Sequence, residues 1–154
     1  MAESIERRLA DLGIVLPKAA APIANYVPFV RTGGLLFIAA QLPVKDGKVA
    51  FTGRLGEGVS LEEGQAAARL CAINLIAQAR AALSDLDRVR RVVRLGGFVA
   101  SAADFTDQPK VINGASDLMV EIFGEAGRHA RAAVGVNVLP LGAAVEIDAV
   151  FEVA

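Results

Sequence analysis

Cysteine, histidine and tryptophan are nearly absent from this sequence. Its 154 residues include one cysteine, Cys71, one histidine, His129, and no tryptophan. A single cysteine excludes an intrachain disulfide, and one cysteine with one histidine argues against a Cys/His metal site. We therefore do not expect metal catalysis.

Long apolar runs are missing as well, although 54% of the residues are hydrophobic. The longest nearly apolar stretches, residues 35–40 and 134–138, have the length of a strand, whereas a membrane-spanning helix needs roughly 20 apolar residues. Residues 1–8 mix acidic and basic side chains and are not followed by the apolar region of a secretory signal. The sequence predicts a cytoplasmic protein with no membrane-spanning segment.

An excess of charge is also missing, because the formal net charge is -1. Such a protein has no bulk attraction to phosphate, so RNA or DNA binding requires a local basic patch. A cluster of arginines exists, but it has no interleaved aromatic side chains of the kind that stack on bases: Arg88, Arg90, Arg91 and Arg94. A charged strand edge or a contact between subunits explains this cluster better, and we do not expect nucleic acid to be the partner.

The N-terminal part of the chain predicts a short helix, a strand and a hairpin. Ser4 is a helix cap at the start of an N-terminal helical extension over residues 1–16. Residues 35–40 are predicted to form a buried strand, because they are continuously apolar and follow a glycine turn. Asp46-Gly47 marks the tight turn of a hairpin.

A long helix is predicted over residues 61–83. Ser60 and Glu63 form the S-x-x-E pattern of a capping box, and apolar residues then recur at helical spacing. Cys71 falls on the apolar side of this helix. It is therefore interpreted as a small buried hydrophobe and not as a nucleophile.

The second half of the chain predicts a strand, a helix and two further strands. Residues 89–99 are rich in Val and Leu, Asp107 and Pro109 supply a cap and a first-turn proline, and residues 131–138 and 143–153 alternate like half-buried strands. The order of these elements predicts one α+β domain over residues 1–154, with two helices packed on one face of a mixed sheet.

Arg131 is the first candidate for a functional residue. Apolar residues occupy the even positions of its strand, so the alternation predicts that Arg131 points away from the core. If residues 131–138 and 143–153 pair as a hairpin, Arg131 and Glu146 share its polar face at a distance of roughly 10 Å, with the small Ala133 between them. A small ligand or a water molecule fits that interval better than a direct ion pair.

Short motifs occur from about residue 26 to the C-terminus, over roughly four-fifths of the chain. In order, they are Tyr26-Val27, Ile38-Ala39-Ala40-Gln41-Leu42-Pro43, Asn74-Leu75, Asp104-Phe105, Asn113, the segment 127–134 and Leu139-Pro140 with Val145-Glu146-Ile147. Each motif is weak alone, and their joint order is specific. In this order they resemble the reactive-intermediate deaminase family, also called Rid or YjgF-like.

The resemblance implies a chorismate-mutase-like fold and a homotrimer with sites in the clefts between subunits. It also implies an enamine/imine deaminase, a hydrolase that converts small carboxylate-bearing 2-imino or 2-enamino acids to 2-oxo acids and ammonia without a cofactor. Arg131 matches the family arginine, whose guanidinium holds the substrate carboxylate. Glu146 follows it at the family's interval of fifteen residues and would position or activate water. The implied substrate-binding positions are Tyr26, Ala39, Asn113 and Ala133.

This sequence departs from the family pattern at three positions. Ala39 replaces a serine, Ala133 replaces a cysteine and His129 replaces a proline, which predicts a divergent subgroup. The alternative for Arg131 is a pair with a carboxylate such as Asp148, for stability or a trimer contact, and the alternative for Glu146 is a solvated glutamate on an exposed strand face. The alternative functions are a non-catalytic trimer that binds small carboxylate metabolites and, less favoured, an RNA-binding protein or endoribonuclease.

Overall fold

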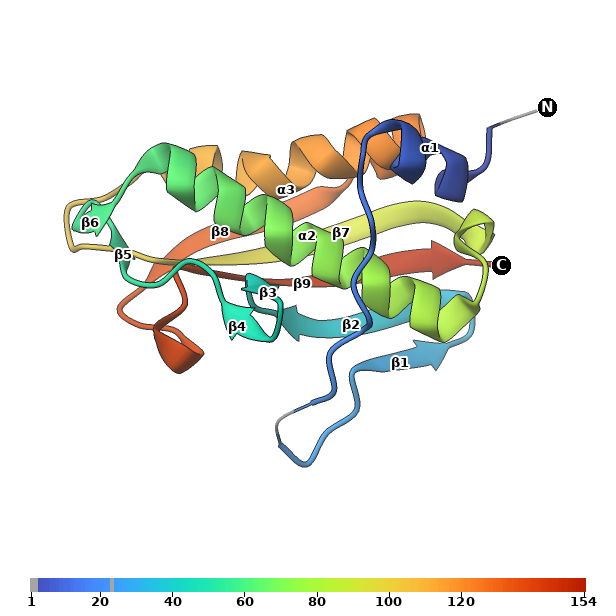
Figure 1. Ribbon diagram of the computed structural model, residues 1–154, viewed down its shortest axis with the longest axis horizontal. Helices are drawn as coiled ribbons and strands as arrows, with labels where there is room; N and C mark the ends of the chain where they lie inside the picture. Colours follow the sequence, from blue (N-terminus) through green and yellow to red (C-terminus); the bar gives the residue numbers. More distant parts are fainter. Residues whose placement is uncertain (1–2, 23) are drawn as a thin grey trace.

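A five-stranded mixed sheet, covered on one face by two helices, forms the centre of the computed structural model (Figure 1). The structure describes residues 3–22 and 24–154. In sheet order the strands are β1 (Phe29–Thr32), β2 (Leu35–Gln41), β9 (Val145–Val153), β7 (Val89–Ala100) and β8 (Ala130–Val136). Strands β7 and β8 are parallel, and the other neighbouring pairs are antiparallel.

The two covering helices are α2 (Leu61–Leu83) and α3 (Gln108–Phe123). The predicted capping box begins α2: the Ser60 hydroxyl accepts the Glu63 backbone N–H, and the Glu63 carboxylate accepts the Ser60 N–H, both at 3.1 Å. The helices approach closely where α3 has Gly114, because a Cβ atom there would collide with a backbone carbonyl of α2. Across the described residues, no helix combines the length and the apolar character needed to cross a membrane.

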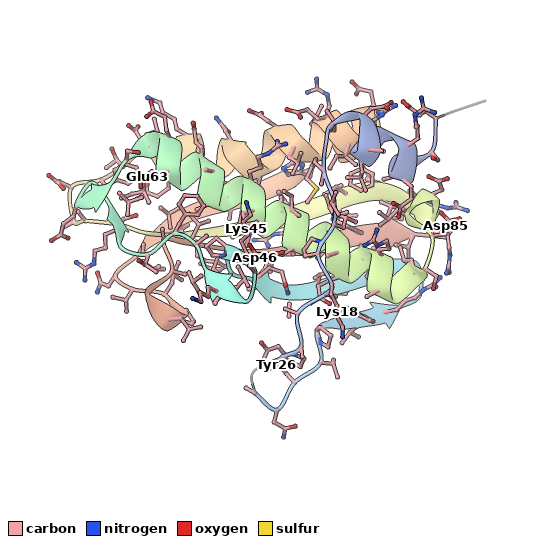
Figure 2. The ribbon with its side chains drawn as sticks, viewed as in Figure 1. Lys18, Tyr26, Lys45, Asp46, Glu63 and Asp85 are labelled. Atoms are coloured by element: carbon pink, nitrogen blue, oxygen red, sulfur yellow. The ribbon has the colours of Figure 1, made fainter. Side chains whose placement is uncertain are left out.

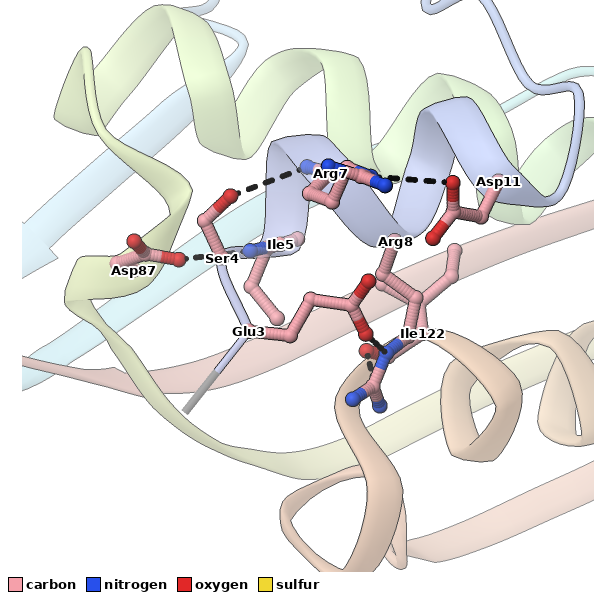
Figure 3. A network of polar contacts seen from close by, with 8 residues as sticks. All are labelled: Glu3, Ser4, Ile5, Arg7, Arg8, Asp11, Asp87 and Ile122. Carbon is pink, nitrogen blue, oxygen red and sulfur yellow. Dashed lines mark hydrogen bonds and ion pairs between the residues drawn. The ribbon is translucent and has the colours of Figure 1, made fainter. Parts of the chain in front are cut away.

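The predicted N-terminal helix is present as α1 (Ile5–Asp11), with Ser4 as its cap. Figure 3 shows how it is attached to the rest of the molecule. The Asp87 carboxylate accepts the first backbone N–H of α1 at 2.8 Å, and Arg8 donates to the carbonyl of Ile122 at the end of α3. The sequence prediction of an additional N-terminal helix is therefore confirmed.

Short elements complete the fold at the two ends of the sheet (Figure 1). The predicted hairpin is present, with both Asp46 and Gly47 at positive φ, as a type I′ turn requires. A second small pair of strands is parallel. These elements are β3 (Val44–Lys45), β4 (Lys48–Val49), β5 (Arg54–Leu55) and β6 (Gly58–Val59), with 3₁₀ turns at Leu86–Arg88, Gly124–Gly127 and Pro140–Gly142.

The predicted hairpin of the last two long strands is wrong, because β7 lies between β8 and β9. The β7–α3–β8 segment is a crossover unit that places β8 parallel to β7 at the edge of the sheet. The chain then returns to the centre as β9, whose inward residues, from Val145 to Val153, are all buried. The central position of β9 thus separates it from β8, the strand that precedes it in the chain.

The predicted orientation of Arg131 is also wrong. Arg131 is in register with Leu95 on β7, and Leu95 is in register with Ala149 on β9. Both partners are buried beneath the helices, so Arg131 lies on the helix-covered face. The apolar even residues of β8 face the uncovered side instead, where Val134 remains 45% exposed.

The start of α3 agrees with the prediction in one respect and differs in another. Pro109 lies in the first turn, as predicted. Asp107, however, makes no side-chain capping hydrogen bond. Its carboxylate instead lies 3.7 Å from the Lys110 ammonium in an exposed ion pair, which competes for the same oxygen atoms.

Candidate functional site

Arg131 is held at the edge of the sheet by uncharged groups of α3. Its Nη1 donates to the Ser116 hydroxyl at 3.0 Å, and its Nη2 donates to the Pro109 carbonyl at 3.1 Å. Among the described residues, no carboxylate lies within 4.0 Å of this guanidinium, and Asp148, the alternative partner, is paired with Arg94 at 3.6 Å. Arg131 is therefore a half-buried cation whose charge no nearby acid neutralises.

His129 continues this network. Its Nε2 lies 2.8 Å from the Ser116 hydroxyl, and its Nδ1 lies 2.6 Å from the Gly127 carbonyl oxygen. Burial lowers the pKa of His129; the Gly127 contact opposes that change, and the charge of Arg131 adds to it. The net effect favours the neutral form of the imidazole.

Asn113 and Ala133 lie beside Arg131, as the resemblance implies. On α3, Asn113 is one turn from both Pro109 and Ser116, on the helix side that meets β8. On β8, Ala133 is two residues after Arg131 on the same face and packs against the core. We refer to Arg131, Ser116, His129, Asn113 and Ala133 as the Arg131 group.

A cavity of about 720 Å³ lies elsewhere, at the end of β2. Its walls come from the strap, which we define as residues 12–22 and 24–28, and from the end of β2, the β3–β4 hairpin, α2 and Glu146. Three of the predicted site residues line it: Tyr26, Ala39 and Glu146. Figure 2 shows Tyr26 and Lys18 on the strap and Asp46 on the hairpin, and all three residues line the cavity.

Three buried carboxamides fix the cavity walls. Asn74 on α2 donates to the carbonyls of Leu42 and Val44, at 3.0 and 3.1 Å. Gln78, one turn further along α2, donates to the carbonyl of Ala20 on the strap at 2.8 Å, and Gln41 donates to that of Ala39 at 2.9 Å. No role for these amides was predicted from the sequence, although polar residues on the apolar side of a helix mark such anchoring positions.

Glu146 is the acid of this cavity. Burial raises the pKa of Glu146 above its usual range, and the negative charge of Asp148 acts in the same direction. A half-buried carboxyl with a raised pKa is a stronger base than an ordinary carboxylate, which suits it to proton transfer. The nearby Cys71 is fully buried, and burial followed by the charge of Glu146 raises the pKa of its thiol well above the usual value, as expected for an inert cysteine.

The structure does not bring Arg131 and Glu146 together within one chain. Glu146 alternates with the buried Val145 and Ile147, so it faces the uncovered side of the sheet, whereas Arg131 faces the helices. Two strand spacings across the sheet and three residues along it separate their Cα atoms by about 14 Å. The predicted shared polar face is wrong for the same reason as the predicted hairpin.

The role of Ser116 and its contact with His129 were not predicted from the sequence. Ser116 is flanked at helical spacing by the buried Ile112 and Met119, so it is a polar residue beside an apolar helix stripe. A polar residue in that position indicates that its hydroxyl has a hydrogen-bonding partner. In the parts of the chain that the structure describes, no group of three or more His, Cys, Asp or Glu side chains is arranged to hold a metal ion.

Comparison with known proteins identifies the family. Residues 6–152 match the family described as "YjgF/chorismate_mutase-like, putative endoribonuclease". The chain belongs to the YjgF family. Its α+β fold, with a mixed sheet and three helices, agrees with that of YjgF-fold structures, which confirms the fold class predicted from the resemblance.

Relatives within the YjgF family cover nearly the whole chain. Protein TCP17 of Trypanosoma cruzi is 54% identical over 149 residues, which cover 96% of this chain and 93% of that protein. The crystal structure of the protein Atu1372 from Agrobacterium tumefaciens, of unknown function, is 53% identical with a TM-score of 0.92 and covers 97% of this chain and 92% of that chain. The RutC family protein y4sK of Sinorhizobium fredii is 33% identical over 132 residues, or 86% of this chain and 90% of that protein.

Proposed function

We propose that this protein is an imine deaminase that hydrolyses small 2-imino or 2-enamino acids to 2-oxo acids and ammonia. The observation that carries this proposal is the Arg131 guanidinium, which is half-buried and has uncharged partners in the described chain. Two of its five N–H donors are used there, and three remain for a ligand. A planar guanidinium is the side chain best suited to bind a carboxylate through two parallel hydrogen bonds.

Glu146 supplies the proton transfer that imine hydrolysis needs. In the proposed reaction, a water molecule adds to the imine carbon while Glu146 accepts one of the water protons. The same carboxyl returns that proton to the nitrogen, which gives a carbinolamine with one hydroxyl and one amino group on the former imine carbon. Glu146 then accepts the hydroxyl proton and passes it to the amino nitrogen, so that the C–N bond breaks as the C=O bond forms, and ammonia leaves with a 2-oxo acid as the second product. The raised pKa of Glu146 supports the first step, because the ionised carboxylate is a stronger base than an ordinary one, and the protonated carboxyl remains an acid for the second step.

The proposed site is completed by a second copy of the chain. Arg131 and Glu146 lie on opposite faces of the sheet, so one small substrate cannot contact both within one subunit. The uncovered sheet face is apolar enough to associate: Val30, Phe37 and Val134 are 51%, 44% and 45% exposed on it. We therefore propose a homotrimer in which Arg131 of one subunit meets the Glu146 cavity of the next.

The direct test is turnover of 2-iminopropanoate. This imine is formed in situ from alanine by an amino-acid oxidase, and its decay and the release of ammonia are followed with and without the purified protein. We expect faster decay with wild-type protein and a rate close to the spontaneous one with Arg131→Ala. A wild-type rate equal to the spontaneous rate, for this imine and for 2-iminobutanoate, rejects the proposal.

A second candidate function is carboxylate binding without catalysis. It is favoured by the separation of Arg131 from every described acid, because an anchoring cation alone suffices to bind a 2-oxo acid. Calorimetric titration with pyruvate distinguishes the two functions. Binding without any turnover of imines supports the binder, whereas turnover that depends on Arg131 supports the deaminase.

A further inference from the structure

Four residues form a hydrogen-bonded chain that ends on Arg131. The Gly127 carbonyl contacts Nδ1 of His129 at 2.6 Å, Nε2 of His129 contacts the Ser116 hydroxyl at 2.8 Å, and this hydroxyl accepts Nη1 of Arg131 at 3.0 Å. The chain links the 3₁₀ turn at Gly124–Gly127, the entry to β8 and the middle of α3. It is separate from the Glu146 cavity, whose lining includes none of these residues.

The direction of each hydrogen bond follows from the chemistry of its ends. A carbonyl oxygen only accepts, so the proton of the neutral imidazole is on Nδ1, facing Gly127. The unprotonated Nε2 then accepts the Ser116 hydroxyl proton. That leaves the lone pairs of the Ser116 oxygen for Arg131, whose guanidinium only donates. Every donor in the chain therefore has one matching acceptor, and reversing one bond disrupts the next.

We propose that Ser116 and His129 are positioning residues that hold the Arg131 guanidinium in the orientation that receives the substrate carboxylate. This inference rests on the proposed function, because it assigns the orientation to carboxylate binding. His129 fixes the Ser116 hydroxyl, and Ser116 fixes Nη1 of Arg131. A long arginine side chain that is fixed beforehand loses less conformational freedom when its ligand binds.

The first test separates substrate affinity from turnover. Ser116→Ala removes the acceptor for Arg131, and we expect the KM for the imine to rise by roughly 2- to 10-fold, the effect of one lost hydrogen bond, with little change in kcat. Ser116→Thr keeps the hydroxyl and should restore most of the affinity. The matched control is Asp117→Ala, at the next position of α3, where the side chain is exposed to solvent.

A pair of histidine variants tests the relay independently of Ser116. The amide of His129→Gln reaches the position of Nε2, so its oxygen can still accept the Ser116 hydroxyl. The shorter amide of His129→Asn reaches only the position of Nδ1, so the Ser116 hydroxyl loses its acceptor. We expect the KM to stay near wild type for His129→Gln and to rise for His129→Asn. If Ser116→Ala does not fold, this pair alone decides, and equal KM values in both histidine variants and wild type overturn the proposal.

A second measurement does not depend on turnover. NMR of the arginine guanidinium groups reports their rotation, and we expect slow rotation of Arg131 in wild type and in His129→Gln but faster rotation in Ser116→Ala and His129→Asn. If wild type hydrolyses imines while the variants show unchanged KM and unchanged rotation, the positioning role is wrong and the proposed function stands. If wild type hydrolyses no imine, the proposed function fails, and unchanged Arg131 rotation and pyruvate affinity in the variants would also overturn the positioning role.

Discussion

The Arg131 group and the Glu146 cavity differ in how each treats its charged residue. Arg131 is tied by hydrogen bonds to uncharged atoms of α3, and it lines neither the Glu146 cavity nor the smaller pocket beside Arg94 and Asp148. Glu146 borders a cavity of about 720 Å³, while buried amides hold the walls in place. One region presents a fixed charge, and the other presents space beside a carboxyl group.

Burial affects these two charges differently. A guanidinium remains protonated at any physiological pH, so partial burial of Arg131 leaves its charge intact. A carboxylate becomes protonated more readily when it is buried, and the pKa of Glu146 is raised accordingly. The first region is therefore suited to binding an anion and the second to moving a proton. Since they lie on opposite faces of the sheet, their cooperation depends on assembly.

The largest effect is expected from Glu146→Gln, which removes the proton-transfer group and leaves the Arg131 group intact. We expect kcat to fall on the order of 10²- to 10⁴-fold, with little change in KM. Steady-state imine hydrolysis measures both constants. The control is Glu152→Gln, an exposed glutamate on the same face of β9. A loss that appears only in KM would mean that Glu146 binds substrate and does not transfer protons.

The pH profile sharpens this prediction. Glu146 must be ionised to accept a proton from water, and the pKa of this carboxyl is raised in the folded protein. Wild-type kcat should therefore decline, as the pH falls, at a higher pH than an ordinary carboxyl would give. The residual activity of Glu146→Gln should lack this decline, and the same decline in both proteins would assign it to another group.

Arg131→Ala comes next and removes the charge from the other region. A charge-assisted contact of about 1.5–3 kcal/mol corresponds to roughly 10- to 150-fold in kcat/KM, and lost orientation adds to this. Arg131→Lys keeps the charge without the planar fork and should recover only part of the activity. Arg128→Ala, at an exposed arginine three residues earlier, serves as the control. Loss of assembly in Arg131→Ala would instead assign Arg131 a structural role.

Mixing the two inactive proteins tests whether the regions cooperate across subunits. If Arg131→Ala and Glu146→Gln chains are unfolded and reassembled together, about a quarter of the sites in random trimers combine an intact Arg131 with an intact Glu146. We expect the mixture to regain activity of that order, while each variant treated alone stays inactive. Light scattering verifies the trimer. A mixture as inactive as its components would contradict a shared site.

The sequence predicted those parts of the fold that depend on local chemistry. Helix α2 begins and ends as predicted, at Leu61 and Leu83, because its capping box and apolar periodicity lie within the helix itself. The inward and outward sides of β9 were also predicted correctly. The order of the strands in the sheet was not predicted correctly, because nothing near residues 139–142 indicates that β7, a strand from earlier in the chain, lies between β8 and β9. The alternation in β8 correctly predicted a strand with one apolar side and one polar side. It did not predict which side faces the helices, because at this edge of the sheet the apolar side faces away from them.

Only part of the candidate site was predicted correctly, because it too depends on contacts between segments that are far apart in the sequence. The resemblance identified Tyr26, Ala39 and Glu146, which the structure brings into one cavity although 120 positions separate the first from the last. Strand spacing alone placed Arg131 beside Glu146, which is wrong. The partners of Arg131 were not found, because a contact between Ser116 and His129 depends on how α3 crosses β8 and not on a local pattern.

The smallest effect on activity is expected at Cys71, which packs beneath the strand that carries Glu146. Its Sγ lies 3.7 Å from the Val145 carbonyl, too far for a serine hydroxyl at that position to make a good hydrogen bond. Cys71→Ser should therefore reduce the free energy of unfolding by about 1–3 kcal/mol in urea denaturation, while kcat is unchanged. Cys71→Ala buries no hydroxyl and is the matched control. Loss of turnover in both variants, while they remain folded, would add a third group to the chemistry that we assign to Arg131 and Glu146 alone.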